Sequence, residues 1–312
     1  MVSLTSLTSV ETTSTTSRRF SILIRSLNIQ SLGATHRSPL KRLPRDTLER
    51  KRFLRRRISS RVTELAYLVD PDAAYVRSFH ARVTALPPGG VVLDRTFFYP
   101  TGGGQPNDRG TLGPPGEPMA EVVDVSKSGS SVLHRIRGSP EVLRRFIVGA
   151  EVEGILDWDR RYRHMRLHTG QHLLSARLFA RTGLRTRRAQ LAGTAATLDL
   201  EGTLPPEALD LLARDLAEAL EHPRPVTLRH VARAEWDRNP FAERSGLVPL
   251  PAQVDPVRVV EIEASDVCPC GGTHLRSTRE IGRVSLRPPV PAPGGDRIGF
   301  SLDEPSLPTP PE

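Results

Sequence analysis

The chain has 312 residues, of which 38% are hydrophobic and 25% are charged, as is usual for globular proteins. No run comes near the roughly 18 consecutive apolar residues of a membrane-spanning helix, so we expect no membrane segment. The two cysteines, Cys268 and Cys270, are too close in sequence for an unstrained mutual disulfide. This excludes a disulfide framework and favours a reducing compartment, which we expect to be the cytoplasm.

The positive charge of the chain is concentrated in residues 1–61. The whole chain has a net charge of +9, but residues 1–61 hold 14 of its 44 Lys and Arg residues and three of its 35 Asp and Glu residues, which leaves residues 62–312 with a net charge of −2. This Ser- and Arg-rich segment has no apolar periodicity, and we expect it to be disordered or non-native, preceding a true start at Val62. A transit peptide for an organelle and a basic RNA-binding arm remain open as alternatives.

Residues 62–158 are predicted to form a small β-barrel or curled sheet. Short runs of strand-forming residues alternate there with Gly- and Pro-rich turns, which is typical of such folds. We expect strands at residues 79–85, 91–99, 120–125, 132–136 and 150–158. The first two should form a hairpin around a Pro-Pro-Gly-Gly turn, and a glycine-rich loop follows them.

Residues 159–303 are predicted to form a second domain, of the two-layer α/β type. A helix at residues 159–182 should end at Gly183, and a second helix, from residue 205 to before Pro223, has leucines on one face. Strands are expected at residues 191–200, 226–230, 257–262, 281–286 and 297–302. Because helices are interspersed with non-adjacent strands, we predict a mainly antiparallel sheet and an α+β fold class. Residues 304–312 should form a disordered, Pro-rich tail.

The first helix carries two histidines, His168 and His172, at positions i and i+4. Such a pair lies on one face of a helix and offers two nitrogen ligands to a metal ion. The pair alone is weak evidence, since it also occurs on ordinary helix surfaces. Thr169 follows His168 where a metalloprotease helix would carry its essential Glu, so that reaction class is excluded.

A second pair of metal-binding residue types comes about a hundred residues later, in Cys268-Pro-Cys270-Gly-Gly-Thr-His274. The two glycines allow a tight turn, through which Cys270 and His274 can converge. Two such pairs together are typical of a zinc site. Spacing alone does not decide between the two cysteines; we expect Cys270 to face the metal and Cys268 to point elsewhere.

Three motifs together resemble the editing domain of alanyl-tRNA synthetase and, still more, the free-standing alanyl-tRNA editing proteins of the AlaX type. They are Tyr99-Pro-Thr-Gly-Gly-Gly-Gln-Pro-Asn-Asp108, His168-x-x-x-His172 and Cys270-Gly-Gly-Thr-His274, in the order of that family. The resemblance covers about residues 62–302, and two domains without a C-terminal extension match the medium-length type. It implies a zinc-dependent deacylase that removes serine, and sometimes glycine, from alanine tRNA.

By motif, the resemblance implies one zinc ion per chain, with His168, His172, Cys270 and His274 as its ligands. It also implies that the glycine-rich loop helps to hold the acceptor end of tRNA, through Gly102, Gly103, Gly104 and Gln105. Gln190 and Thr197 are candidates for binding the serine hydroxyl, and Asp266 for orienting a ligand histidine. Each of these last three residues also fits an ordinary strand or turn position.

Arginine clusters are candidate RNA contacts, because residues 62–312 carry no net positive charge to attract tRNA. The candidates are Arg160, Arg161, Arg163 and Arg166 in the first helix, and Arg185, Arg187 and Arg188 after it. We expect a monomer whose partner is the acceptor end of alanine tRNA carrying a misattached amino acid. Two other functions remain open: a zinc-stabilised tRNA-binding module without hydrolytic activity, and a zinc hydrolase for a small molecule. Four protein ligands describe a closed zinc site, which leaves open whether zinc acts in catalysis or positions the substrate.

Overall fold

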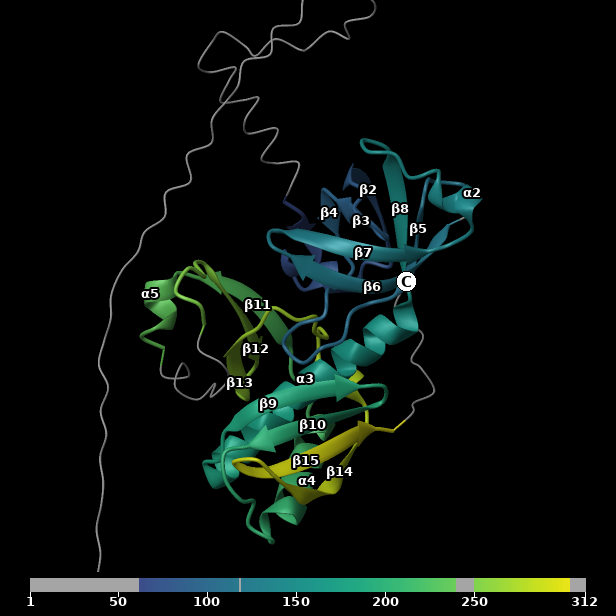
Figure 1. The fold of residues 1–312 in the computed structure, drawn as a ribbon. Helices are drawn as coiled ribbons and strands as arrows, with labels where there is room; N and C mark the ends of the chain where they lie inside the picture. Colours follow the sequence, from purple (N-terminus) through teal and green to yellow (C-terminus); the bar gives the residue numbers. More distant parts are fainter. Residues whose placement is uncertain (1–61, 118, 240–249, 304–312) are drawn as a thin grey trace, which may run out of the picture. The chain divides into compact units, whose positions relative to one another are not determined.

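The structure, a computed structural model, describes residues 62–117, 119–239 and 250–303 (Figure 1). The predictions for residues 1–61 and 304–312 therefore lie outside the described residues. Among the helices of these three ranges, none is long and apolar enough to cross a membrane.

The strands up to residue 156 form a closed barrel, in agreement with the predicted β-rich fold. Its order is β2-β3-β7-β6-β5-β8, and all neighbours pair antiparallel (Figure 1). The strands are β2 (Ser78–Ala85), β3 (Gly90–Leu93), β5 (Gly110–Gly113), β6 (Ala120–Ser128), β7 (Ser131–Arg137) and β8 (Glu151–Leu156). Every second residue of β2, namely Phe79, Ala81 and Val83, is buried in the barrel core, as the period of a strand requires.

Short elements flank the barrel. They are β1 (Glu64–Leu65), which pairs in parallel with β4 (Arg95–Thr96), the 3-10 helices η1 (Ala66–Leu68) and η2 (Asp72–Tyr75), and the one-turn helix α2 (Pro140–Leu143). The hairpin predicted around the Pro-Pro-Gly-Gly turn is confirmed by the pairing of β2 with β3.

The chain after β8 forms a two-layer arrangement, which confirms the predicted α+β class. An antiparallel sheet of order β14-β15-β10-β9 packs against two helices, α3 (Trp158–Thr182) and α4 (Ala208–Glu221). Its strands are β9 (Thr186–Ala192), β10 (Ala195–Leu200), β14 (Val284–Ala292) and β15 (Gly295–Leu302). Leucines of both helices share one apolar core with Leu198 and Phe300 of the sheet.

A smaller antiparallel sheet has the order β11-β12-β13. Its strands are β11 (Val226–Val231), β12 (Val257–Ile262) and β13 (Asp266–Pro269). The short helix α5 (Arg233–Trp236) lies between β11 and β12 in the chain, and η3 (Thr278–Ile281) follows β13. Val260 and Ile262 of β12 join the main core, whereas Val257 and Val259 join a separate cluster around Trp236. The strand is therefore buried on both faces.

Helix α3, which carries the predicted histidine pair, has clear signals at both ends. The side chain of Asp157 accepts a hydrogen bond from the Arg160 N–H at 3.1 Å, the typical contact of an N-cap residue. Gly183 follows the last turn with a φ of 70°, a left-handed conformation that glycine adopts without strain. The predicted helix and its end at Gly183 are confirmed.

Three predicted strands differ from the structure. The strand predicted at residues 91–99 is divided into β3, which ends at Leu93, and β4, which ends at Thr96. Residues 191–200 are not one strand but the end of β9, a two-residue turn and β10. The strand predicted at residues 281–286 is β14, which begins at Val284 and continues to Ala292 through Pro288 and Pro289. A register shift between Arg287 and Val290, on an edge strand, accommodates these prolines, which cannot donate to a sheet ladder.

A buried ion pair joins the loop after β4 to helix α3. The side chains of Arg161 and Asp108 are both 0% exposed, and Arg161 Nε lies 2.9 Å from Asp108 Oδ2. The same Oδ2 atom accepts the Tyr99 N–H at 2.7 Å, and Arg161 Nη1 donates to Ala74 O at 2.8 Å. The pair thus fixes both ends of the glycine-rich segment 99–108 against α3.

We predict that Asp108→Ala lowers the free energy of unfolding by about 3–5 kcal/mol, because it leaves the buried guanidinium of Arg161 without its counterion. Chemical denaturation measures this difference. Glu121→Ala is the matched control: Glu121 pairs with Arg137 at 2.6 Å, but the side chains are 45% and 73% exposed. Its loss should be below about 1 kcal/mol. Equal losses in the two variants would contradict the structural role assigned to the buried pair.

Candidate metal centre

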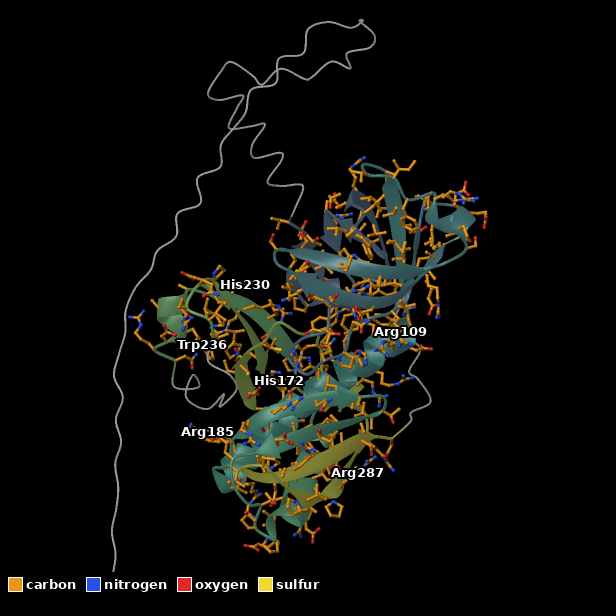
Figure 2. The ribbon with its side chains drawn as sticks, viewed as in Figure 1. Arg109, His172, Arg185, His230, Trp236 and Arg287 are labelled. Carbon is orange, nitrogen blue, oxygen red and sulfur yellow. The ribbon has the colours of Figure 1, made fainter. Side chains whose placement is uncertain are left out.

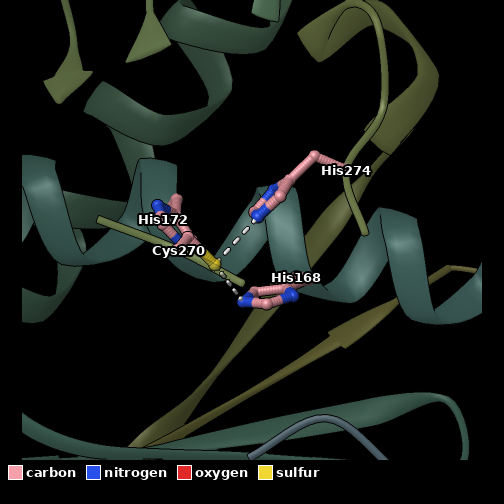
Figure 3. Close-up of side chains that lie close together, drawn as sticks. All are labelled: His168, His172, Cys270 and His274. Atoms are coloured by element: carbon pink, nitrogen blue, oxygen red, sulfur yellow. Dashed lines mark hydrogen bonds between the residues drawn. The ribbon is translucent and has the colours of Figure 1, made fainter. Parts of the chain in front are cut away.

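The four side chains predicted as metal ligands lie together in the structure (Figure 3). His168, His172, Cys270 and His274 each offer one ligand atom, and these four atoms lie within 4.8 Å of one another. Cys270 Sγ is 3.2 Å from His274 Nε2 and 3.5 Å from His168 Nε2. The three histidines are only 3–6% exposed.

Two elements bring the four side chains to one point. His168 and His172 are one turn apart in the middle of α3, where Figure 2 labels His172, while Cys270 and His274 follow β13. The Cys270 N–H donates to Arg258 O of β12 at 3.1 Å, which extends the strand pairing up to the ligand. The Gly272 N–H then donates to Cys270 Sγ at 3.3 Å, as the chain turns toward His274.

Each of the three histidines has its Nδ1 atom held by a different hydrogen-bond partner. His168 Nδ1 lies 2.8 Å from Gln105 Oε1, and His172 Nδ1 lies 2.9 Å from Asp266 Oδ2. His274 Nδ1 lies 3.3 Å from the hydroxyl of Thr169. An amide oxygen and a carboxylate accept hydrogen bonds, so Nδ1 of His168 and of His172 must carry the proton. Nε2 is then the nitrogen of each ring that can bind a metal ion.

The electrostatics of the cluster favour a thiolate at Cys270. Burial raises the pKa of the Cys270 thiol, but the imidazoles of His168 and His274 outweigh this and hold the pKa well below its usual value. Burial and the neighbouring His168 lower the pKa of His274 to about 3. For His172, burial lowers the pKa, but hydrogen bonds to Asp266 and Cys270 raise it to about 10. A metal ion that binds His172 must therefore displace a proton.

One thiolate and three imidazole nitrogens form a donor set that suits a divalent ion of borderline softness, above all Zn²⁺. The donors fit the ion because they are buried, converge on one point and already have their outer hydrogen bonds in place. Cys268 belongs to β13 and is 6% exposed. With His172 and Asp266 it forms a second group of possible metal ligands, which shares His172 with the first group. Because Asp266 engages Nδ1 of His172, Cys270 rather than Cys268 is the candidate for the fourth ligand.

The candidate metal site opens into a cavity of about 720 Å³, a size usual for ligand pockets. His168, His172 and Cys270 form part of its wall, together with residues of β9 and of the glycine-rich loop. Among the residues predicted to contact the substrate, Gly102, Gly103, Gly104, Gln105 and Gln190 line this cavity. Thr197 does not: it lies opposite Gln190 on β10, outside the lining.

The glycine-rich loop is a tight turn that requires its glycines. Gly103 and Gly104 have φ values of 56° and 82°, and the backbones of Gly102 and Gln105 exchange two hydrogen bonds across them. A Cβ atom on Gly104 would lie 2.2 Å from Ala189 O of β9. The Leu191 N–H also donates to Gly104 O at 2.9 Å, so the loop lies directly against the edge of β9.

Gln105 has surroundings that favour a different role from the predicted contact with tRNA. Gln105 is 1% exposed, and both polar atoms of its side-chain amide form hydrogen bonds. Nε2 donates to Thr273 Oγ1 at 2.9 Å, while Oε1 accepts from His168 Nδ1 and from the Thr273 N–H. We therefore assign Gln105 to positioning His168.

Thr169 is a site residue that the sequence analysis missed. It is 0% exposed, and its hydroxyl also accepts the Leu275 N–H at 3.1 Å, which ties α3 to the segment carrying His274. In the sequence, Thr169 could have been noticed as a polar residue on the buried face of the helix that carries the two histidines.

Two arginines that were considered as RNA contacts, Arg161 and Arg166, are buried instead. Arg166 Nη2 donates to Ile281 O at 2.8 Å.

We predict that Gly272→Ala weakens metal binding by about 10–100-fold, the usual cost of disturbing the groups that hold a ligand. A Cβ atom at this position would lie 2.0 Å from His168 Cε1, so the imidazole must move. Gly271→Ala is the matched control, since a Cβ atom there meets nothing within 4 Å. Titration with Zn²⁺ in the presence of a competing chelator measures both affinities. Equal affinities for the two variants would contradict the ligand geometry.

Comparisons with known proteins agree with this arrangement of motifs. Residues 69–160 match the family described as tRNA synthetases class II (A), and residues 257–301 match the threonyl and alanyl tRNA synthetase second additional domain. The second match includes Cys270 and His274.

Two kinds of relatives are similar over most of the described chain. The alanyl-tRNA editing protein AlaX-M of Methanosarcina barkeri is 33% identical over 235 residues, which cover 72% of this chain and 92% of the relative. The AlaX-M protein of Methanosarcina acetivorans is 34% identical over 236 residues, with the same coverage. The alanine–tRNA ligase of Thermococcus kodakarensis is 38% identical over 251 residues, 78% of this chain but 26% of the ligase. The chain thus spans about a quarter of the length of the ligases it matches.

Proposed function

The chain belongs to the AlaX family of alanyl-tRNA editing proteins, and we propose that it is a zinc-dependent hydrolase that removes serine from wrongly charged alanine tRNA. Glycine is the second amino acid to be tested. The observation that carries the proposal is the convergence of four ligand atoms within 4.8 Å of one another at the wall of a large cavity.

A separate editing site is needed because a synthetase pocket for alanine rejects serine poorly. An apolar pocket discriminates against one added hydroxyl by only about a hundredfold. A site that hydrogen-bonds this hydroxyl discriminates better, since alanine would leave the polar partner unpaired. Gln190 is our proposed partner, because its exposed side chain lies on the cavity wall. Thr197 lies outside that wall, and we do not include it.

Zinc bound by His168, His172, Cys270 and His274 would supply a Lewis acid that polarises the ester or an attacking hydroxyl. The protein residues around it have positioning roles in this proposal. Asp266 and Gln105 hold His172 and His168 in one tautomer and orientation, and Thr169 orients His274. The glycine-rich loop forms another part of the lining, where the Gly103 and Gly104 N–H groups are proposed to face the acceptor end.

A zinc-stabilised tRNA-binding module is the second candidate function. It is favoured by the ligand count, because four protein ligands complete a tetrahedral shell of the kind found in structural sites, whereas catalytic sites usually retain an open position. The two candidates predict the same zinc content and differ in whether bound Ser-tRNA(Ala) is hydrolysed.

We predict that His172→Ala and Cys270→Ala lose zinc and slow the hydrolysis of Ser-tRNA(Ala) by more than about 100-fold, beyond the loss typical of an outer-shell change. Cys268→Ala is the control, because Cys268 lies outside the four-ligand cluster, and it should retain both zinc and activity. Release of labelled serine gives the rate, and elemental analysis of the purified proteins gives the zinc content.

Full hydrolysis by both zinc-free variants would contradict a metal-dependent reaction. Loss of zinc from Cys268→Ala comparable to that from Cys270→Ala would overturn the ligand assignment. If the wild-type protein binds Ser-tRNA(Ala) tightly without hydrolysing it, the binding module replaces the hydrolase.

A further inference from the structure

The cavity beside the metal ligands is lined by three cationic side chains and, among the described residues, by no carboxylate. Lys127 comes from β6 of the barrel, and Arg187 and Arg188 come from β9. This concentration of positive charge is local, because residues 62–312 have a net charge of −2. A cavity lined by one sign of charge attracts a ligand of the opposite sign.

The three cations differ in how they are engaged. Arg187 donates to Pro293 O and packs against Gly294, so its guanidinium is held by the turn between β14 and β15. Lys127 and Arg188 are exposed, and neither forms an ion pair with any residue of the described ranges. These two side chains are therefore available to a ligand.

The carboxylate nearest to Arg188 in the sheet is already occupied. Asp199 lies directly opposite Arg188 in the pairing of β9 with β10. Its two oxygens accept from Arg297, with Nε–Oδ1 at 2.5 Å and Nη2–Oδ2 at 3.1 Å. Asp199 thus directs its hydrogen bonds to Arg297 and not to Arg188, and its single negative charge is shared among Arg297, Arg187 and Arg188.

The glycine-rich loop connects the two strands that carry these cations. The Thr101 N–H donates to Val125 O of β6 at 3.0 Å, two residues before Lys127. At its other end, Gly104 O accepts the Leu191 N–H of β9 at 2.9 Å, three residues after Arg188. Lys127 and Arg188 thus flank the loop on its two sides, and both belong to the lining of the same cavity as the metal ligands.

We propose that Lys127 and Arg188 bind the phosphates of the nucleotides that precede the terminal adenosine of tRNA, while the aminoacyl ester lies at the metal ligands. This inference rests on the proposed function for the identity of the substrate. The acceptor end is single-stranded and carries one phosphate per nucleotide, so an ester fixed at the terminal ribose places phosphates beside it. Lys supplies a compact charge and Arg a planar pair of donors, which are the two common ways of binding phosphate.

Two substrates that share the ester but differ in phosphate content test the proposal. Ser-tRNA(Ala) carries the phosphates, whereas 3′-O-seryl-adenosine carries none. For Lys127→Ala and Arg188→Ala, the ratio of kcat/KM for Ser-tRNA(Ala) to that for seryl-adenosine should fall by about 5–10-fold. Arg287→Ala is the control: Arg287 is exposed on β14 (Figure 2) and does not line the cavity, and its ratio should equal that of wild type.

Binding of uncharged tRNA(Ala) provides a readout that does not depend on hydrolysis. Lys127→Ala and Arg188→Ala should each bind this tRNA more weakly than wild type. For each of them, the slope of log Kd against log salt concentration should become shallower by about 0.7–1, as expected when one phosphate contact is lost. Arg188→Lys keeps the charge and should retain the wild-type slope. Zinc content should be unchanged in all variants, which excludes an effect through the metal site.

The proposal fails if wild-type salt dependence persists in both alanine variants, or if their kcat/KM falls equally for the two substrates. If wild-type protein hydrolyses neither substrate, the proposed function fails. A shallower salt slope in the variants would then still support phosphate binding by Lys127 and Arg188.

Discussion

The constraint on which the rest of the site depends is the burial of one thiolate and three imidazole nitrogens at a single point. A buried thiolate beside three nitrogen lone pairs is stable only if a cation or protons balance the negative charge. Burial lowers the pKa of His172, but hydrogen bonds to Asp266 and Cys270 raise it to about 10, which favours a proton on this imidazole. Zinc would replace that proton and engage all four donors at once.

The same constraint explains the residues around the cluster. Gln105, Asp266 and Thr169 each use one acceptor atom to fix an imidazole, and they come from the glycine-rich loop, β13 and α3. Gly272 lacks a Cβ atom where one would strike the ring of His168. Asp108 and Arg161 hold the loop that contains Gln105 against α3. Because Gln105 binds His168, this buried ion pair contributes to the position of the His168 imidazole. The barrel domain therefore contributes to the site through the loop between β4 and β5.

The sequence predicted those parts of the structure that have strong local signals. Helix α3 was predictable because apolar residues recur along it and Gly183 ends it. The four ligands were predictable as two motifs of suitable residue type. By contrast, the part of β9 before residue 191 was not predicted. Arg187 and Arg188 interrupt the apolar alternation there, because β9 is an edge strand and lines the cavity. The roles of Gln105 and Thr169, and the burial of Arg161, depend on tertiary contacts that no sequence spacing specifies.

The central claim is that the four-ligand cluster binds zinc and that this zinc is required to hydrolyse Ser-tRNA(Ala). The most direct test is to remove the metal from the wild-type protein with a chelator, measure serine release, and add Zn²⁺ back. The account predicts that hydrolysis falls to the rate without protein and that one equivalent of Zn²⁺ per chain restores it, with circular dichroism showing a folded protein throughout. A folded, zinc-free protein that hydrolyses Ser-tRNA(Ala) at the full rate would contradict it.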